Sequence, residues 1–408
     1  MSHPFTVDEI KQIHQKISKI IHYTPLHYAD KLSALTGNNV YLKLENLQKT
    51  GSFKLRGATN KINKLTDEEK KHGIIAASAG NHAQGVAYAA TNLGLKSTIV
   101  MPENAPVAKI QATEKYGGKV VLSGRYFDDA LAKAMEIKEK ENLTLIHAFD
   151  DIEIIKGQAT IAYEIDQQIK NIDYCLVPIG GGGLMSGISA YLKQVNPNIK
   201  MIGVEAANVN SYQQAKALNK PVMIESKPSI ADGIAVKKVS DLTFSILNQY
   251  VDDVVVVSEE EIAEAMLFLM ENCKFVTEGS GAVTAAALMF DKLNIKNQNK
   301  TVVGLVSGGN IDIAMVGNII NKALIKTNRR LVLSVNIPSD NKEILNVINI
   351  INSCGAKIFK IKTNRDIMYL ELNEIHTTFI IDLSNPDQQQ QIIDKISKAN
   401  YNITSITD

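Results

Sequence analysis

The pattern of apolar and polar residues along this chain changes character at about residue 326. Before that point, short apolar runs alternate with segments whose apolar positions recur at helical spacing. Strands separated by helices predict parallel sheets with crossover helices, and eight such runs from Ile75 onward exceed one small sheet. The runs that predict strands are Val40–Leu44, Ile75–Ala77, Thr98–Met101, Val120–Leu122, Thr144–Ile146, Tyr174–Ile179, Met201–Val204, Val254–Val257 and Thr301–Val306.

The order of these segments predicts the domain organisation. Thr6 and Glu9 form a capping-box pair that begins an amphipathic helix extending to about Ile21, and Gly37 ends a second short helix. We expect one α/β domain over residues 1–326. Within it we expect a large subdomain (1–45 and 151–326) and a smaller inserted subdomain (46–150).

After about Lys326 a different module is predicted. Four strands and two helices follow in the order β-α-β-β-α-β, which is the ferredoxin-like α+β arrangement, over residues 327–408. The strands are expected at 331–337, 357–361, 378–383 and 403–406, and the helices at 344–351 and 387–399. The segment Asp366–Ile375 fits either an extra hairpin or a long loop.

Composition narrows the class of protein. The 408 residues are 45% hydrophobic and 21% charged, with a formal net charge of +1, so there is no basic excess for nucleic acid. No apolar run is long enough to span a membrane, and residues 1–5 lack a secretory signal. Cys175, Cys273 and Cys354 lie far apart without metal-ligand spacing. We therefore expect a cytoplasmic protein with no metal site and no nucleic-acid or membrane partner.

Four consecutive glycines, Gly180–Gly183, lie between an apolar strand and a helix that begins near Leu184. Glycine lets consecutive N–H groups converge without an intervening Cβ, and the helix adds the positive end of its dipole. The segment lacks the Gly-Lys-Ser/Thr of a Walker loop and the third glycine of a dinucleotide fingerprint, because Ser186 stands there. A flexible turn is the alternative, but the strand-to-helix setting favours a phosphate cradle of unspecified ligand.

Lys54 lies between two apolar residues, Phe53 and Leu55, near the start of an expected helix. A lone lysine is normally a solvated surface charge. If burial removes Lys54 from water, its pKa falls and its amine becomes available for Schiff-base chemistry. Lys49 and Arg56 are nearby competitors, but a guanidinium forms no stable imine, so Arg56 is expected to be structural.

Two further polar segments follow expected strands. The segment Ser78–His82 opens a helix, where small hydrogen-bonding residues suit a carboxylate; the alternative is that Ser78 or Asn81 only caps the helix. The segment Ser307–Asn310 follows the last strand of the large sheet, at the carboxyl edge where ligands of α/β proteins bind.

These four segments resemble, in content and order, those of threonine dehydratases (threonine ammonia-lyases), which are fold-type II pyridoxal-phosphate enzymes. They read Ser-Phe-Lys-Leu-Arg-Gly-Ala at 52–58, Ser-Ala-Gly-Asn-His-Ala-Gln-Gly at 78–85, four glycines at 180–183 and Ser-Gly-Gly-Asn at 307–310. The resemblance covers about residues 24–326. It implies an α/β fold similar to the tryptophan synthase β chain, with two parallel-sheet domains and pyridoxal 5′-phosphate as cofactor.

The resemblance also implies a role for each matching residue. It places the cofactor lysine at Lys54, next to Phe53 in the cofactor site, and the partner of the pyridine nitrogen at Ser307. The contact to the cofactor's 3-hydroxyl falls on Asn81. The phosphate loop falls on Gly180, Gly181, Gly182, Gly183 and Leu184. The substrate carboxylate would be held by Ser78, Asn81 and His82.

The implied activity is loss of water and then ammonia from L-threonine, giving 2-oxobutanoate, and from L-serine, giving pyruvate. Such an enzyme serves isoleucine biosynthesis or threonine catabolism. An L-serine dehydratase, a serine racemase and a non-catalytic pyridoxal-phosphate carrier are the alternatives. Racemases of this type carry an acid–base serine where this chain has Ala79, which favours elimination. A carrier would need no carboxylate site.

The C-terminal module resembles an ACT domain, a regulatory fold that binds amino acids. Many such domains have Asp-x-Pro-Gly after the first strand, where this chain has Asn336-Ile337-Pro338-Ser339, and an asparagine where it has Lys357. The resemblance implies a small-molecule effector or a purely oligomerising role. We expect a homodimer or homotetramer.

Overall fold

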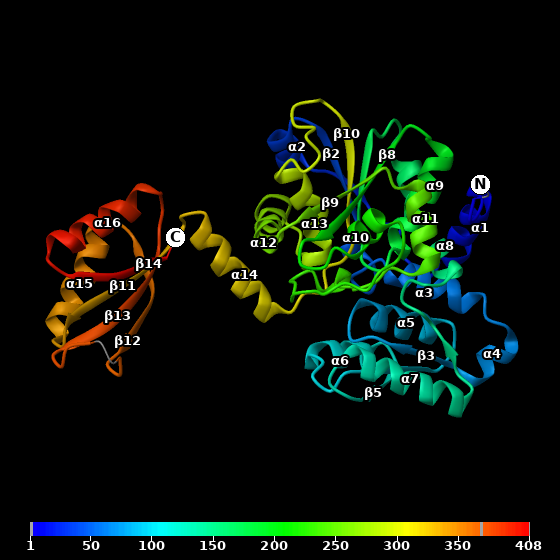
Figure 1. Ribbon diagram of the computed structural model, residues 1–408, viewed down its shortest axis with the longest axis horizontal. Coiled ribbons are helices and arrows are strands. Elements are labelled where there is room, and N and C mark those ends of the chain that lie inside the picture. Colours follow the sequence, from blue (N-terminus) through cyan, green and yellow to red (C-terminus); the bar gives the residue numbers. More distant parts are fainter. Residues whose placement is uncertain (1–2, 368–369, 408) are drawn as a thin grey trace. The chain divides into compact units, whose positions relative to one another are not determined.

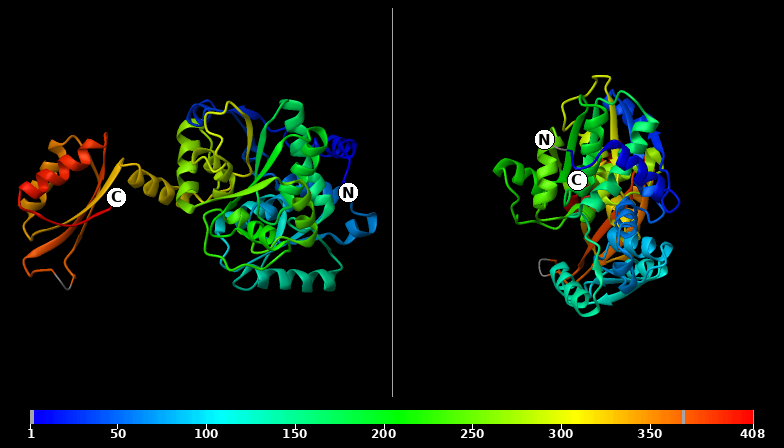
Figure 2. Two further views of the ribbon diagram at one scale, coloured as in Figure 1. Left: turned by 45° about the horizontal axis from the view of Figure 1, so that its top comes forward. Right: turned by 90° about the vertical axis from the view of Figure 1, so that its right-hand side faces the viewer.

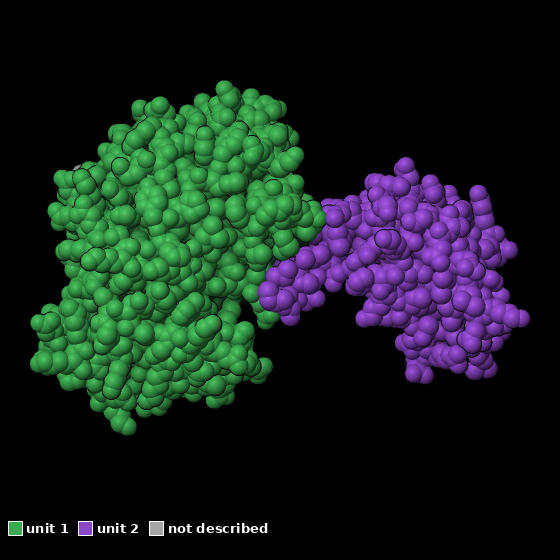
Figure 3. Space-filling view, turned by 180° about the vertical axis from the view of Figure 1, so that it is seen from behind, with its two compact units in different colours: residues 1–312 green, residues 313–408 purple. Residues whose placement is uncertain are grey.

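The computed structural model describes residues 3–367 and 370–407 (Figure 1). The chain forms two compact units, residues 1–312 and residues 313–408 (Figure 3). Helix α14 (Ile313–Lys326) groups with the second unit, so this division falls earlier than the predicted boundary after residue 326. The predicted boundary and the subdomain limits stay predictions.

The first unit contains a six-stranded sheet in the order β1-β2-β10-β7-β8-β9. Five of these strands are parallel, and β1 runs antiparallel to β2 at one edge. Strand β1 was not predicted, because its three residues are partly or fully exposed and show no alternation of apolar and polar positions. The strands are β1 (Leu26–Tyr28), β2 (Asn39–Leu44), β7 (Tyr174–Pro178), β8 (Lys200–Ala206), β9 (Asp253–Val257) and β10 (Thr301–Val306).

Helices cover both faces of this sheet, as the doubly wound pattern requires (Figure 1). One face carries α1 (Val7–Ile17), α8 (Ile152–Gln168), α9 (Gly183–Val195) and α11 (Asp241–Tyr250). The other carries α2 (Asp30–Thr36), α12 (Glu259–Phe268) and α13 (Gly279–Met289). Shorter elements are η1 (Glu45–Leu47), α10 (Ser211–Leu218), η2 (Asp232–Ile234) and the π-helical turn η3 (Leu269–Cys273).

A second, fully parallel sheet in the order β5-β4-β3-β6 is built from residues that lie between β2 and β7 in the sequence. Helix α5 packs on one face and α7 on the other (Figure 1). The strands are β3 (Ile74–Ala77), β4 (Ser97–Met101), β5 (Gly118–Leu122) and β6 (Thr144–Leu145). The helices are α3 (Lys54–Asn63), α4 (Asp67–His72), α5 (Asn81–Asn92), α6 (Val107–Lys115) and α7 (Phe127–Glu141).

The first two helices test the capping predictions. Thr6 Oγ1 accepts the Glu9 N–H at 3.1 Å as expected, but the reciprocal bond of a capping box is not made. The Glu9 carboxylate instead lies 2.8 Å from Lys156 Nζ, because an ammonium competes better for it than a backbone N–H. Helix α1 ends at Ile17 rather than near Ile21. Gly37 ends α2 in the left-handed region at φ +66°, which confirms that prediction.

The C-terminal sheet has the antiparallel order β12-β13-β11-β14, which is the predicted ferredoxin-like arrangement. Both helices cover the same face, where Leu333, Phe379 and Ile392 form part of a separate core (Figure 2). The elements are β11 (Arg330–Pro338), α15 (Asn341–Ser353), β12 (Lys357–Asn364), β13 (Glu374–Asp382), α16 (Asp387–Lys398) and β14 (Asn402–Thr407). The described part of the ambiguous segment 366–375 forms no strand before Glu374, and residues 368–369 lie outside the described chain.

Within residues 3–367 and 370–407, no helix is long and apolar enough to cross a membrane. In the same ranges, no cluster of three or more His, Cys, Asp and Glu side chains is arranged to hold a metal ion. The three cysteines are unpaired thiols, and Cys175 and Cys354 are buried.

Candidate active site

Two of the predicted segments are joined through their backbones. The N–H of Phe53 donates to the Ser307 carbonyl at 3.2 Å, and the N–H of Gly309 donates to the Gly51 carbonyl at 2.9 Å. The first segment follows β2 and the second follows β10, which are adjacent parallel strands whose carboxyl ends share one edge of the sheet. Lys54 and Ser307 are therefore brought to the same place.

A third segment is attached through side-chain amides. Asn310 Nδ2 donates to the Thr50 carbonyl at 2.7 Å and to Asn81 Oδ1 at 2.8 Å. Gly51, at φ +71°, makes this contact feasible, because an ideal Cβ there would lie 2.2 Å from Asn310 Oδ1. Asn81 is the first residue of α5, so this bond holds the start of α5 against the Lys54 segment.

Lys54 is the first residue of α3, as predicted, and its Nζ donates to the Ala148 carbonyl at 3.0 Å. The ring of Phe53 lies 5.1 Å from the same nitrogen. Burial lowers the pKa of the Lys54 amine to about 8, although the nearby Glu278 carboxylate acts in the opposite direction. About a tenth of the amine is therefore neutral at pH 7, far more than for an ordinary lysine, and the neutral form is the one that acts as nucleophile or base.

The glycine loop follows β7 and ends at Gly182, whose φ of +91° places it in the left-handed region before α9. Among the described residues, the N–H groups of 180–184 donate to no protein atom. Phe149 packs against this loop so closely that an ideal Cβ at Gly181 would lie 2.3 Å from Phe149 Cδ1. The glycines thus serve two purposes, a row of free donors and a close fit to Phe149.

The start of α5 differs from an ordinary side-chain cap. The N-cap residue is Gly80, and Ser78 lies before it, where its Oγ accepts the Gly80 N–H at 3.2 Å. The N–H groups of Asn81 and His82 have no acceptor in the described chain, so the first turn keeps donors for an anion. Neither Ser78 nor Asn81 caps the helix, and the capping alternative is wrong.

His82 is a buried, neutral histidine. Its Nε2–H donates to the Ile146 carbonyl at 2.8 Å, which leaves Nδ1 as the acceptor. Burial lowers the pKa of His82 to about 3, and the neighbouring Lys54 ammonium acts in the same direction. His82 therefore contributes hydrogen bonding without charge over the physiological range of pH.

The structure adds Glu278, which no sequence motif singled out. Its carboxylate is buried, and its Oε1 accepts from Asn81 Nδ2 and from Ser280 Oγ, both at 2.7 Å. Burial raises the pKa of Glu278, and the Asp232 charge adds to that effect. The only signal in the sequence is a glutamate directly before the Gly-Ser-Gly that begins α13.

Arg56 confirms its expected structural role. Its guanidinium is completely buried and pairs with Glu45 (Nε to Oε2, 2.8 Å) and Glu164 (Nη1 to Oε1, 2.7 Å). Lys43, also buried, lies 2.7 Å from Glu164 Oε2. This buried ion cluster (Lys43, Glu45, Arg56 and Glu164) ties the first turn of α3 to β2, η1 and α8. It fixes the helix from which Lys54 projects.

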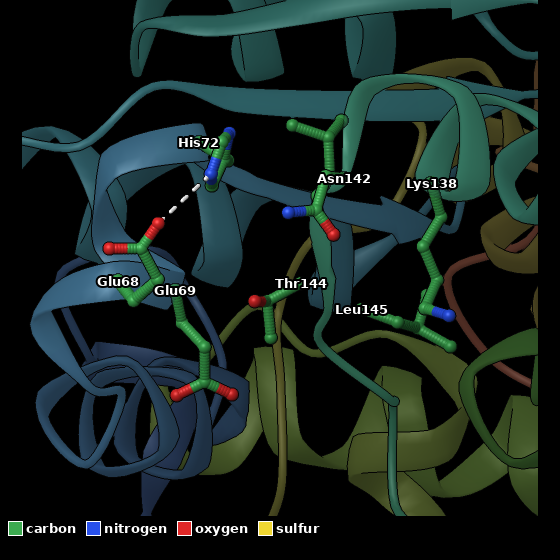
Figure 4. A pocket seen from close by; sticks show the side chains of 8 residues that line it. Glu68, Glu69, His72, Lys138, Asn142, Thr144 and Leu145 are labelled. Atoms are coloured by element: carbon green, nitrogen blue, oxygen red, sulfur yellow. Dashed lines mark ion pairs between the residues drawn. The ribbon is translucent and has the colours of Figure 1, made fainter.

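Two surface hollows are separate from this arrangement or only border it. One, of about 390 Å³, is lined by exposed Glu68 and His72 with residues 142–145 and holds none of the predicted site residues (Figure 4). The other, of about 500 Å³, is lined by His147, Phe149 and residues 238–242. Its lining includes both chain neighbours of Ala148 but neither Ala148 nor Lys54.

The residues at this edge fit pyridoxal phosphate. The free N–H groups of 180–184 suit a phosphate dianion, Lys54 presents an amine of lowered pKa, and Ser307 presents a buried neutral hydroxyl. A doubly wound α/β fold whose phosphate cradle and buried lysine are linked through Phe149 and Ala148 defines a Schiff-base enzyme of the pyridoxal-phosphate class.

A family model for "pyridoxal-phosphate dependent enzyme" matches residues 17–308, and the chain belongs to this family. It is 45% identical over 360 residues to an L-threonine ammonia-lyase of Thermotoga maritima, covering 88% of this chain and 89% of that protein. It is 46% identical over 327 residues to the catabolic L-threonine dehydratase TdcB of Staphylococcus aureus, covering 79% and 94%. The predicted fold-type II class and the cofactor are thereby confirmed.

Two solved structures extend the comparison. Processed threonine deaminase isoform 2 of Solanum lycopersicum is 39% identical, with a TM-score of 0.71 over 77% of this chain and 93% of that one. Maize serine racemase is 34% identical, with a TM-score of 0.74 over 80% and 99%. The fold is therefore shared by enzymes of two activities, and the chemistry must be argued from the site.

Proposed function

We propose that this protein is an L-threonine ammonia-lyase, which converts L-threonine to 2-oxobutanoate and ammonia, and that it also converts L-serine to pyruvate and ammonia. The observation that carries the proposal is the position of Lys54, whose amine has a lowered pKa and whose neighbour Phe53 is bonded through its backbone N–H to Ser307 at the carboxyl edge of the sheet. The names of the Thermotoga and Staphylococcus relatives support threonine as substrate.

Pyridoxal phosphate, when bound, supplies an electron sink that acidifies the Cα–H bond of an amino acid. Lys54 would hold the cofactor through its amine and, once the substrate amine has replaced it, would take the Cα proton on Nζ as a general base. The N–H groups of Gly180, Gly181, Gly182, Gly183 and Leu184 would hold the phosphate. Asn81 would contact the 3-hydroxyl, with Phe53 beside the cofactor.

The start of α5 would orient the substrate. Ser78, Asn81 and His82 offer hydroxyl, amide and backbone N–H donors to a carboxylate, and the helix dipole adds to the attraction. Ser307 would face the pyridine nitrogen with a neutral hydroxyl. A neutral partner gives a weaker electron sink than a carboxylate would, which favours prompt loss of the β-hydroxyl.

A serine racemase is the second candidate, because a maize serine racemase shares the fold. Racemisation needs a proton donor on the cofactor face opposite the lysine, and the methyl group of Ala79 offers none. An L-serine dehydratase would use the same residues with a different side-chain preference. A non-catalytic carrier would have no use for the free donors at the start of α5.

We further propose a cytoplasmic homodimer or homotetramer that takes part in isoleucine biosynthesis or threonine catabolism. The C-terminal antiparallel module, with its own core, is consistent with an ACT-like domain that binds a small effector. The Staphylococcus relative, named as catabolic, supports threonine catabolism as one of these two roles.

A coupled assay for 2-oxo acid, with L-threonine, L-serine and their D forms as substrates, tests this proposal. We expect turnover of the L forms and little D-serine from L-serine. Formation of D-serine at a rate comparable to pyruvate would establish racemisation instead. A protein that binds pyridoxal phosphate but releases no 2-oxo acid from either L form would be a carrier.

A further inference from the structure

Glu278 lies at the junction of the segments that form the site. Its Oε1 accepts from Asn81 Nδ2 at 2.7 Å, and its own N–H donates to the Gly308 carbonyl at 3.2 Å. Ser280, which donates to the same Oε1, accepts the Ser307 hydroxyl at its carbonyl oxygen at 3.1 Å. One carboxylate therefore connects the start of α5 to the segment that follows β10.

Two glycines make room for this carboxylate. An ideal Cβ at Gly308 would lie 2.4 Å from Glu278 Oε1, and one at Gly233 would lie 3.3 Å from the same atom and 2.6 Å from Ser280 Oγ. No real Cβ approaches an oxygen as closely as 2.4 Å. The local backbone is therefore shaped around a buried acidic group, which costs free energy unless it is hydrogen-bonded or paired.

The hydrogen bonds to Glu278 fix the orientation of the Asn81 amide. An ionised carboxylate can only accept, so the donor end of the amide faces Glu278. The acceptor end, Oδ1, takes the Asn310 Nδ2–H at 2.8 Å. With both ends engaged, the amide cannot turn over without breaking two hydrogen bonds.

The charged groups that face Glu278 come from three other elements. Lys54 on α3 is the positive charge inside the site, whereas Asp232 on η2 repels the carboxylate and Lys109 on α6 attracts it. Asp232 and Lys109 also pair with each other at 3.0 Å, and of the two Asp232 has the larger effect on the pKa of Glu278. Among the described residues, Glu278 is in turn the one charged group that raises the pKa of the Lys54 amine against the effect of burial.

We propose that Glu278 is a positioning residue for the reaction: its carboxylate fixes the Asn81 amide and supplies the negative charge that balances the Lys54 ammonium. The inference rests on the proposed function, since it treats Lys54 and Asn81 as cofactor residues. Its consequence is that the amine can hold a proton in the buried site, which a base must do between removing a proton and returning it.

The test measures the Lys54 amine in the protein freed of pyridoxal phosphate, by the pH dependence of its reductive methylation followed by peptide mass spectrometry. In Glu278→Gln, the pKa of Lys54 should fall below about 8 by on the order of one pH unit. At pH 7 that change would speed labelling of Lys54 about fivefold. Glu278→Asp, which keeps the charge, should restore most of the difference.

Glu205 provides a matched control. It is a second buried carboxyl, on β8, which accepts from the backbone N–H groups of Tyr212 and Gln213 at 2.8 Å and does not contact the site. Glu205→Gln should leave the Lys54 labelling profile unchanged. An equal shift in both glutamine variants would mean that loss of any buried carboxyl loosens the protein, and would overturn the proposal.

A second variant covers the case in which Glu278→Gln does not fold. Ser280→Ala removes one hydrogen-bond donor to the carboxylate, which raises the pKa of Glu278. With less negative charge on Glu278, the pKa of Lys54 should fall, as it should in Glu278→Gln. An unchanged Lys54 profile in every folded variant would overturn the proposal. Because the labelling needs no turnover, this result is independent of whether the protein proves to be a threonine ammonia-lyase.

Discussion

The amine of Lys54 lies 3.0 Å from the carbonyl oxygen of Ala148, a residue 94 positions further along the chain. The next residue, Phe149, packs against Gly181 and Gly183 of the glycine loop. A single short loop after β6 therefore contacts both the lysine and the expected phosphate cradle. The spacing between these two groups is set by packing rather than by their own segments.

Lys54 is expected to carry the cofactor, because its amine has the lowered pKa and donates to Ala148, whose neighbour Phe149 packs against the glycine loop. Borohydride reduction of the protein bound to pyridoxal phosphate, followed by peptide mapping, should place the pyridoxyl group on Lys54. In Lys49→Ala, the matched control, the pyridoxyl group should be found on the same peptide. A label on Lys49 or elsewhere would refute the assignment.

Gly181→Ala is expected to destabilise the folded protein by about 1–3 kcal/mol, because the new methyl would overlap the Phe149 ring. Affinity for pyridoxal phosphate should fall in parallel, as the loop moves away from its fitted position. Urea unfolding and cofactor titration measure the two effects. The double variant with Phe149→Ala should lose less stability than the two single changes added together.

The control for this glycine is Gly317, on α14, where an added Cβ would meet nothing within 4 Å. Gly317→Ala should leave the free energy of unfolding unchanged or raise it, by up to about 1 kcal/mol, because it removes a helix-interior glycine. Equal losses at both positions would show that contact with Phe149 is not the cause.

His82 should make stability depend on pH. Its pKa is lowered from 6.5 to about 3, so below pH 6.5 the unfolded chain gains a proton that the folded protein does not bind. Stability is complete above pH 6.5 and falls as the pH drops toward 3. At pH 5 the loss amounts to about 2 kcal/mol. His82→Asn should flatten this part of the curve; an unchanged slope in urea unfolding between pH 7 and 5 would refute the buried neutral state.

Truncation after Asn328 should leave a folded protein that binds pyridoxal phosphate and retains much of its turnover. The apolar core of the C-terminal sheet is drawn from residues 331–396, so its loss removes none of the core of the first unit. Only the intact protein should respond to branched-chain amino acids or another small effector. Such coupling is typically about 1–3 kcal/mol, or roughly 5- to 150-fold in affinity.

The truncation has two informative failures. A truncated protein that folds without activity would mean that the module completes the catalytic assembly. A flat response of the intact protein to every effector would leave the module structural, in keeping with Pro338-Ser339 where many ACT domains have Pro-Gly.

The site segments could be predicted because each chemical requirement is met within a few consecutive residues. Four glycines after a strand and a lysine between two apolar residues are visible without any structure. Glu278 could not be found in this way, because its partner Asn81 is 197 positions away and nothing local marks a glutamate as buried. The same reason explains why the capping box at Glu9 was wrongly predicted. Its carboxylate pairs with Lys156, on a helix far along the chain, instead of accepting the backbone N–H of Thr6.

The elements of the fold could likewise be predicted only where the local sequence pattern marks them. Alternating strands and helices predicted both parallel sheets, because a buried parallel strand is apolar throughout. Strand β1 was missed because its three residues, Leu26–Tyr28, are partly or fully exposed. Helix α1 was predicted to be too long, because apolar residues continue at helical spacing after its last residue, Ile17.

The buried ion cluster has a consequence for the newly made chain. Arg56 leaves the ribosome 108 residues before Glu164, its partner on α8. At about 5–20 residues per second, this interval lasts roughly 5 to 20 seconds. Until Glu164 emerges, burying Lys43, Glu45 and Arg56 together would leave one positive charge unpaired, so the helix that carries Lys54 should reach its final position only after residue 164 has been made. A ribosome stalled before residue 164 should therefore display Lys54 in a protease-sensitive segment, and one stalled well beyond it should not.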